Sequence, residues 1–355
     1  MVYNSKVSII VPIYNAEPYL SRCLNSLVNQ TLHDIEIICI NDGSTDNSLE
    51  ILESYAQRDI RIKSINIENS GVSRCRNIGL KYINSKYVVF VDSDDWLDRE
   101  ALEVMYNYAE LENSDLVMCA YMREYVSHSK DKKFDMPEIM VYENEELEKI
   151  HRRLFGPIDE ELGSPELLDS LGTVWAKLYK SEIIKNNNFE FRDLSIIGSN
   201  EDSLFNIYVI NKMKKVIFIN KPYYHYWREN KQSITSLYNP NLKNQWEKLH
   251  KEMNQFIEDN NLKDTYRNAL NHRVWMSVLG LGLNECSKAN TSTELDKIKN
   301  IKIILNDDKI LESYIKFKIH KFPLHWRVFY RCIKHSRSLL VYIILNTIEF
   351  LRKVI

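Results

Sequence analysis

Three carboxylates directly follow an apolar segment, and they are the residues of this 355-residue chain best suited to bind a cation. The segment Tyr87–Val91 is β-branched and aromatic, which predicts a buried strand. Of the carboxylates Asp92, Asp94 and Asp95, the first two face the same side of an extended chain and can share one ion. Such oxygen ligands suit Mg²⁺ or Mn²⁺ held partly by the phosphates of a substrate. The alternative is that these aspartates only turn the chain and cap the next helix.

Two earlier segments have the same character, because each is a predicted strand that ends in residues able to line a binding pocket. The first strand is expected at Lys6–Ile13 and the second at Ile35–Ile40. The residues at their ends are Pro12, Tyr14, Asn15 and Asp42.

Strands and amphipathic helices alternate from residue 6 to residue 121, with further strands expected at Ile60–Ile67 and Leu116–Tyr121. This alternation predicts an α/β fold with a mostly parallel, Rossmann-like sheet and flanking helices. Right-handed crossovers bring the carboxyl ends of parallel strands to one edge, where such sheets bind ligands. We therefore expect Asp42, Asp92 and Asp94 to lie at one crevice.

A second acidic pair, Glu201 and Asp202, opens a predicted helix after the segment 198–200. Acidic residues also favour the first turn of a helix for dipole reasons alone, so this pair has a structural alternative. An aromatic strand is expected at Tyr223–Trp227 after a short strand at Lys215–Ile219, and polar residues follow it. Those polar residues include Arg228, Lys231 and Ser233.

The length of the chain favours about two domains. We predict one domain over residues 1–236, with a variable acidic insertion of loops and short helices at 131–170, and a helical region over 237–355. The tail from Lys316 to Ile355 mixes basic and large apolar residues, and its only carboxylate is Glu349. This pattern predicts an amphipathic helix at a membrane surface. The alternative is a helix that packs on the protein itself or on a second subunit of a homodimer.

Composition excludes several classes of protein. The net charge of −2 provides no general attraction to nucleic acid. Six cysteines without a CxxC pair favour free thiols in a reducing cytoplasm over disulfides or zinc. We expect no signal peptide, because Lys6–Ile13 contains Pro12 and leads into polar sequence, and no transmembrane helix, because no run of 18 apolar residues occurs. The nine glycines include no GxGxxG motif.

Several motifs in a fixed order resemble those of family 2 glycosyltransferases of the GT-A fold. The similarity is close over about residues 6–112 and looser over 172–236. The segments that carry it are VSIIVPIYNAEPYLSRCLNSLVNQTL, IEIICINDGSTDNS, NSGVSRCRNIGLKY, VVFVDSDDW, VWAKLYKSEII, NEDSLF and YYHYWRENKQSIT. Such sequences are similar to bacterial enzymes that build lipooligosaccharide, capsule or other surface glycans from nucleotide sugars.

The resemblance implies a nucleotide site at the edge of the sheet. Pro12, Tyr14 and Asn15 would line the base and ribose pocket, and Asp42 would accept a hydrogen bond from uracil. Arg76 would reach the nucleotide. Asp92 and Asp94 match the family's DxD motif. Asp94 would be the more direct ligand of Mn²⁺ or Mg²⁺, and Asp92 would lie nearer the ribose and the waters of the metal. Ser93, between them, would contact the nucleotide.

The resemblance also implies an inverting transfer of a hexosyl or N-acetylhexosaminyl group from a UDP-sugar to a glycan or glycolipid hydroxyl. Asp202 of the family's ED pair with Glu201 would be the general base. The loop with Arg228, Lys231 and Ser233 would close over the diphosphate. Trp96 and Trp175 are candidates either for sugar stacking or for the core. The free cysteines and the basic, apolar tail predict a cytoplasmic location at the inner face of the cytoplasmic membrane.

Two other functions are considered. A sugar nucleotidyltransferase would need a glycine-rich basic loop after the first strand, and this chain has Pro12-Ile13-Tyr14-Asn15-Ala16 there. A non-catalytic sugar or nucleotide binding module has less need of clustered carboxylates, whose mutual repulsion is costly.

Overall fold

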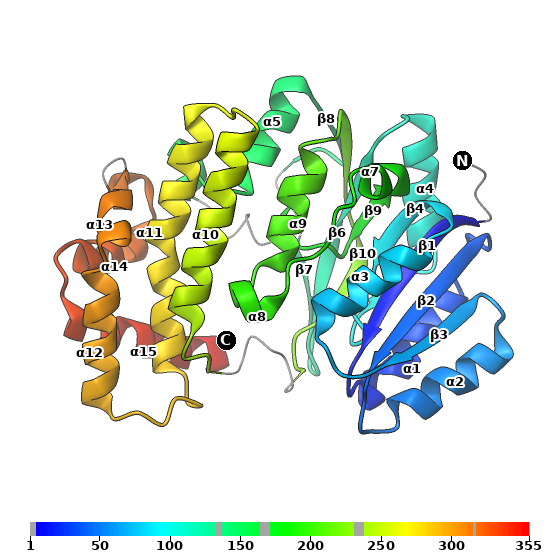
Figure 1. The fold of residues 1–355 in the computed structure, drawn as a ribbon, viewed down its shortest axis with the longest axis horizontal. Coiled ribbons are helices and arrows are strands. Elements are labelled where there is room, and N and C mark those ends of the chain that lie inside the picture. The colour runs from blue at the N-terminus through cyan, green and yellow to red at the C-terminus, as the bar shows by residue number, and fades with distance from the viewer. Residues whose placement is uncertain (1–4, 133–135, 164–170, 231–237, 315–316, 355) are drawn as a thin grey trace. The chain divides into compact units, whose positions relative to one another are not determined.

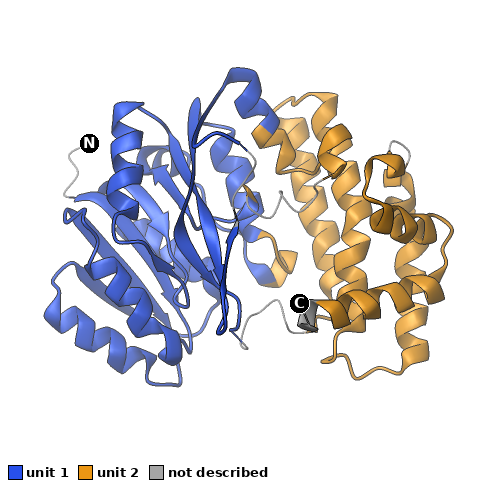
Figure 2. Ribbon diagram, turned by 180° about the vertical axis from the view of Figure 1, so that it is seen from behind, with its two compact units in different colours: residues 1–149, 172–194, 201–230 blue, residues 150–171, 195–200, 231–355 orange. Residues whose placement is uncertain are grey.

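The computed structural model describes residues 5–132, 136–163, 171–230, 238–314 and 317–354, and the chain forms two compact units (Figures 1 and 2). Unit 1 comprises residues 1–149, 172–194 and 201–230, and unit 2 comprises 150–171, 195–200 and 231–355. Unit 1 is built on a β-sheet, and unit 2 is helical.

The sheet of unit 1 is mixed but mostly parallel, in the order β3-β2-β1-β4-β9-β6-β10-β5. Its first four strands are parallel, as the alternation of strands and helices predicts. The antiparallel strand β9 lies between β4 and β6 and separates the first four strands from the later ones. The bounds along this path are β3 Ile62–Ile67, β2 Ile35–Asp42, β1 Ser5–Ile13, β4 Ser85–Phe90, β9 Lys177–Lys180, β6 Leu116–Glu124, β10 Lys215–Trp227 and β5 Trp96–Leu97.

The two predicted strands at 215–219 and 223–227 form one strand, β10, whose register with β6 shifts between Ile219 and Tyr224. Pro222 lies in this shift and has no N–H to donate to the ladder, which explains why the sequence reads as two strands.

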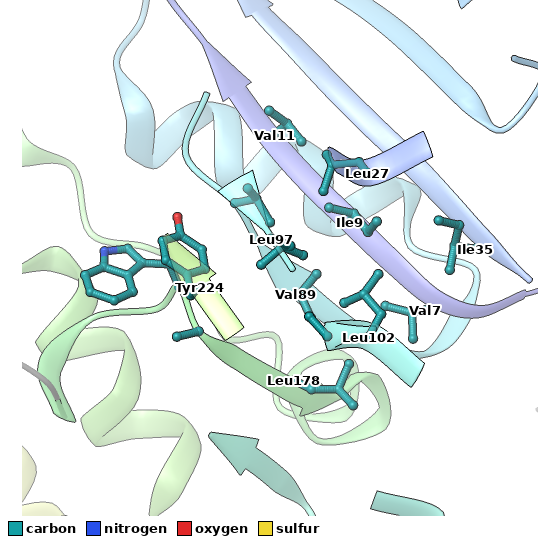
Figure 3. Close-up of a cluster of buried hydrophobic side chains, with 14 of the residues drawn as sticks. Val7, Ile9, Val11, Leu27, Ile35, Val89, Leu97, Leu102, Leu178 and Tyr224 are labelled. Atoms are coloured by element: carbon teal, nitrogen blue, oxygen red, sulfur yellow. The ribbon is translucent and has the colours of Figure 1, made fainter. Parts of the chain in front are cut away.

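Side chains alternate between the two faces of the central strands, and helices cover both faces. Val7 and Ile9 of β1 belong to one buried cluster with Leu27 and Leu102, which come from α1 and α4 (Figure 3). On the other face α3 packs closely on β1 and β2. The helices of unit 1 are α1 Glu17–Val28, α2 Ser48–Arg58, α3 Val72–Tyr82, α4 Ala101–Leu111, α7 Ser181–Asn186 and α9 Glu201–Ile210.

The predicted insertion at 131–170 contains more regular structure than loops and short helices. Strand β7, Ser129–Lys132, pairs with β6, and β8, Ile139–Glu143, pairs with β10. Helix α5, Asn144–Arg153, and a 3-10 turn at Asp159–Gly163 follow. The acidic composition does not reveal β8, because its pairing partner lies more than 70 residues away.

Unit 2 packs its helices around a second apolar cluster that includes Trp275, Phe322, Tyr330 and Leu345. The last two helices therefore contribute residues to the core of their own unit. The helices are α8 Leu194–Ile197, α10 Leu242–Asp259, α11 Asp264–Cys286, α12 Glu294–Leu305, α13 Asp308–Ser313, α14 Leu324–Lys334 and α15 Ser338–Val354, with a 3-10 turn at Ile319–Lys321. Within the described ranges, none of the helices has the length and apolar character needed to cross a membrane.

Candidate active site

A buried arginine joins the two acidic motifs that the sequence singled out. Arg76 lies on α3, and only 3% of the residue is exposed. Its Nη2 donates to Asp92 Oδ1 at 3.0 Å, and its Nη1 donates to Asp202 Oδ1 at 2.6 Å and to Glu201 Oε1 at 3.2 Å. The three carboxylates compensate one buried guanidinium, so the strand end of β4 and the start of α9 form one site. The guanidinium of Arg76 contacts these carboxylates, and its predicted contact with the nucleotide stays a prediction.

Two donors hold the carboxylate of Asp202 at the start of α9. Its Oδ2 accepts from the Val174 backbone N–H at 3.2 Å, and its Oδ1 accepts from Arg76. Burial raises the pKa of Asp202 well above its ordinary value, Glu201 and Asp92 raise it further by repulsion, and Arg76 opposes them. A carboxylate with a raised pKa is a stronger base than an exposed aspartate.

A buried lysine lies beside this acid pair, although sequence reasoning assigned it no role. Lys177 is 2% exposed, and its Nζ donates to Thr173 Oγ1 at 3.2 Å. Burial lowers the pKa of Lys177 to about 7, while the nearby charge of Asp202 opposes the shift. The only sequence signal was a lysine inside an otherwise apolar strand, VWAKLY.

Asp94 is held on both its backbone and its side chain. Arg22 Nη2 donates to the Asp94 carbonyl at 2.8 Å, and Asn230 Nδ2 donates to Asp94 Oδ2 at 2.8 Å. The Arg22 guanidinium lies 3.8 Å from the ring centre of Trp96 and 4.7 Å from that of Trp227. This cation–π contact with two rings fixes the loop that carries Asp94. Sequence reasoning missed both Arg22 and Asn230, because neither is part of a carboxylate motif.

Asp95, the third carboxylate of the motif, is structural. It is fully buried, accepts from the Tyr224 hydroxyl at 2.6 Å, and accepts from the Trp227 N–H at 2.8 Å. Burial raises the pKa of Asp95 well above its ordinary value, with further contributions from Asp94 and Asp92. Asp95 thereby ties the loop after β4 to β10.

The donor set at Asp92 and Asp94 fits a cation that shares its coordination with a substrate. Each side chain has one oxygen in a hydrogen bond, and the structure assigns the other oxygen no partner among the described residues. Burial, and then repulsion from Asp92, raises the pKa of Asp94, and a cation would relieve that repulsion. In the described part of the chain no group of three or more His, Cys, Asp or Glu side chains is arranged to hold a metal ion. Two carboxylates are sufficient for Mg²⁺, which usually retains water and phosphate ligands.

The loops after β1 and β2 are linked to each other. Asn15 has a left-handed backbone with φ of 46°, its N–H donates to Ser44 Oγ at 3.0 Å, and its Oδ1 accepts from the Thr45 N–H at 2.8 Å. Tyr14 is 51% exposed and is therefore accessible to a ligand, whereas Pro12 is buried in β1.

Asp42 lies at the end of β2 and is only 3% exposed. It accepts from the Ser70 N–H at 2.7 Å, the Ser70 hydroxyl at 3.1 Å and the Gly71 N–H at 2.8 Å. The Cys75 thiol, whose pKa burial raises with a further contribution from Asp42, also contacts this carboxylate, so most of the roughly four acceptor positions of a carboxylate are taken. The structure therefore shows Asp42 holding the loop before α3, and its predicted contact with uracil stays a prediction.

Four predicted site residues remain: Arg228, Lys231, Ser233 and Ser93. Arg228 Nη1 donates to the Tyr226 hydroxyl at 3.3 Å, and Lys231 and Ser233 lie outside the described residues. Ser93 is half-buried beside Asp92 and Asp94.

The two tryptophans considered for sugar stacking make intramolecular contacts. Trp175 is 7% exposed and stacks on Tyr224, with ring centres 4.8 Å apart, so it belongs to the core. Trp96 is half-buried and stacks on His225 with ring centres 4.9 Å apart, and Arg22 lies over the same indole ring.

Known proteins resemble this chain in sequence and fold. The family model described as "Glycosyl transferase family 2" matches residues 8–162. A putative glycosyltransferase of Bacillus subtilis, EpsH, is 31% identical over 311 residues, which are 87% of this chain and 86% of EpsH. A cholesterol galactosyltransferase of Borreliella burgdorferi is 33% identical over 63% of this chain and 60% of its own length.

Among solved structures, S. aureus TarS residues 1–349 in complex with UDP-GlcNAc is similar, with a TM-score of 0.63 and 20% identity. The alignment covers 97% of this chain and 91% of that one. At this identity the likeness demonstrates the fold. The near-full-length similarity to EpsH, the family match over the β4 site and the shared fold together show that this chain belongs to the family 2 glycosyltransferases.

Proposed function

We propose that this protein is an inverting glycosyltransferase that moves a hexosyl or N-acetylhexosaminyl group from a UDP-sugar to a hydroxyl of a glycan or glycolipid in bacterial surface-glycan synthesis. The observation that carries the proposal is Arg76, which joins Asp92 of the donor side to Glu201 and Asp202 of the acceptor side. The complex of TarS with UDP-GlcNAc and the name of the cholesterol galactosyltransferase are consistent with such a donor and a lipid-linked acceptor.

In this proposal Asp94 and Asp92 would hold Mg²⁺ or Mn²⁺. A bound cation of this kind stabilises the negative charge of a departing diphosphate. Asp202 takes the proton of the acceptor hydroxyl while the oxygen of that hydroxyl forms a bond to the anomeric carbon of the donor sugar. The bond from the anomeric carbon to the diphosphate breaks at the same time. Because the attack comes from the face opposite the leaving group, one base is enough, and the configuration inverts. Arg76 lowers the pKa of Asp202 and so favours the charged form that accepts the proton, and Asn230 orients Asp94.

The test is a donor screen that measures release of UDP with truncated surface glycolipids as acceptors and Mn²⁺ present. We expect Asp94→Ala to abolish metal-dependent turnover. We expect Asp202→Asn to lower kcat by about 10²-fold or more while UDP binding is unchanged, because general base and metal ligand are separate groups.

A matched control is Asp59→Asn, which removes a carboxylate paired with Arg61 at the surface of unit 1 and should leave turnover unchanged. Full activity of Asp202→Asn would show that the base is another residue. Undiminished activity in excess chelator would remove the metal from the proposal. Release of pyrophosphate in place of UDP would indicate a nucleotidyltransferase.

We also propose that the enzyme works at the inner face of the cytoplasmic membrane, where a glycolipid acceptor would be found. The support for this proposal is the composition of the tail, which is basic and rich in large apolar residues. The part of the tail that meets the lipid is argued next.

A further inference from the structure

Helix α15 carries a stripe of exposed apolar side chains. Successive residues of an α-helix are rotated by about 100°, so the stripe falls within an arc of about 120°. Thr347 is the only other exposed residue on this arc among residues 338–351, and no charged residue lies on it. The members of the stripe, with their exposed fractions, are Leu339 56%, Leu340 49%, Ile343 51%, Phe350 65% and Leu351 45%.

The opposite face of α15 is fixed against its own unit. Val341 and Leu345 are fully buried in the core of unit 2. A Cβ added to Gly282 of α11 would lie 2.5 Å from Leu345 Cδ1, so the two helices are in close contact. Because this packing fixes the rotation of α15 about its axis, the helix cannot turn the stripe inward. A helix with apolar residues on both faces needs a further apolar partner.

Positive charge surrounds the start of this stripe. Arg331, Lys334 and Arg337 are exposed at the junction of α14 and α15, and the positive end of the α15 dipole lies there too. Glu349 is the only carboxylate after position 316. Two other basic side chains of this region are paired, Lys318 with Asp159 and Lys321 with Glu160, and exposed Lys334 lies with its Nζ 4.8 Å from the ring centre of Tyr314.

We propose that α15 lies in the plane of an anionic lipid surface, with its stripe in the acyl boundary and Arg331, Lys334 and Arg337 at the headgroups. Anionic headgroups complement this charge. In an isologous contact a second copy of the chain would present the same tail, whose single carboxylate, Glu349, supplies little negative charge to pair with these basic residues. The same lipid surface would hold a glycolipid acceptor, and in that respect the inference rests on the proposed function.

The experiment is sedimentation of the full chain with vesicles of phosphatidylcholine and phosphatidylglycerol, compared with vesicles of phosphatidylcholine alone. We expect binding to the anionic vesicles, and we expect the double variant Leu340→Gln/Ile343→Gln to weaken it by about tenfold or more. The matched control is Leu295→Gln on α12, a leucine that is 79% exposed outside the stripe, and it should bind as the wild type does.

A second double variant, Arg331→Gln/Arg337→Gln, should lose about tenfold in binding to the anionic vesicles and reduce its dependence on salt. Equal binding of the stripe variant and the wild type would overturn the proposal. The proposal would also be overturned if light scattering showed the wild type to be a dimer and the stripe variant a monomer while both bound vesicles equally. The stripe would then contact a second copy of the chain.

The readout separates this inference from the proposed function. UDP release from a donor in vesicle-free solution should be the same in the stripe variant and the wild type, because the stripe is outside the catalytic machinery. Vesicle binding without turnover of any donor would refute the proposed transfer and leave the lipid surface in place.

Discussion

Replacing Arg76 by methionine is the most direct test of how the site is held together. The change keeps an unbranched, apolar stem and removes the guanidinium, whose charge three carboxylates share. Asp92, Glu201 and Asp202 would then remain close together without their common partner.

The expected loss of stability follows from the burial of this cluster. Removing one partner of a buried ion pair costs about 3–5 kcal/mol. The Arg76 side chain is 4% exposed, and its three partners are 29%, 14% and 18% exposed, so the carboxylates retain some water. We therefore expect the lower end of that range, a loss of about 3 kcal/mol in the free energy of unfolding.

The expected change in activity follows from the direction in which Arg76 moves the pKa of Asp202. Arg76 lowers this pKa, and burial, Glu201 and Asp92 raise it. Without Arg76 the protonated form of Asp202 becomes more stable relative to the charged form, so the pKa of Asp202 rises. The ascending limb of the pH–rate profile should therefore move to higher pH. At pH values below that limb, the fraction of active base falls about tenfold for each whole-number rise in the pKa of Asp202.

The assay combines urea unfolding at neutral pH with kcat/KM measured across the pH range. The control is Arg74→Met, two residues earlier on the same helix and exposed, which should change stability by less than about 0.5 kcal/mol. Arg76→Lys keeps the charge but not the two-nitrogen geometry, so it should be intermediate. An Arg76→Met protein as stable as the wild type, with an unmoved pH profile, would refute the reasoning.

Three further predictions concern single positions. Burial lowers the pKa of Lys177 to about 7, so between about pH 7 and its ordinary pKa of 10.5 the unfolded chain binds more protons than the folded one. The stability of the wild type relative to Lys177→Met, measured by urea titration, should therefore rise with pH over this range. A difference in stability that stays constant with pH would contradict this. Tyr224→Phe removes a 2.6 Å hydrogen bond to buried Asp95 and should cost about 1–3 kcal/mol in the same assay, and a loss below about 0.5 kcal/mol would count against that role. Gly79→Ala places a Cβ 2.6 Å from Ile10 Cγ2 and should cost about 1–3 kcal/mol by overpacking, and an unchanged thermal unfolding midpoint would argue against this close contact.

The sequence predicted the first half of the sheet well, because those strands carry local signals. Buried parallel strands are continuous apolar runs, and α1 to α4 have one apolar face each. The direction of the chain then brings the residues after β2 and β4 to the same edge. For that reason residue types and positions alone were enough to predict that Asp42, Asp92 and Asp94 lie at or after the ends of strands that meet one edge of the sheet.

The later strands were harder to predict, because their neighbours are distant in sequence. Strand β9 is only four residues long and runs antiparallel between β4 and β6. Strand β8 pairs with β10 from inside a segment whose acidic composition favours loops. In both cases the strand forms because of its pairing partner, and the hydrophobic period of the sequence does not identify that partner.

The amino-acid sequence by itself determined which chemical groups this protein has at its strand ends and its membership of a glycosyltransferase family. Only the tertiary structure decided which of those groups meet. Arg76 reaches Asp202 across 126 positions of the chain, and Tyr224 reaches Asp95 across 129. Local patterns record whether a side chain is buried, because burial follows the period of its helix or strand. The partner that neutralises a buried charge depends on the packing of distant elements, and that packing exists only in the folded chain.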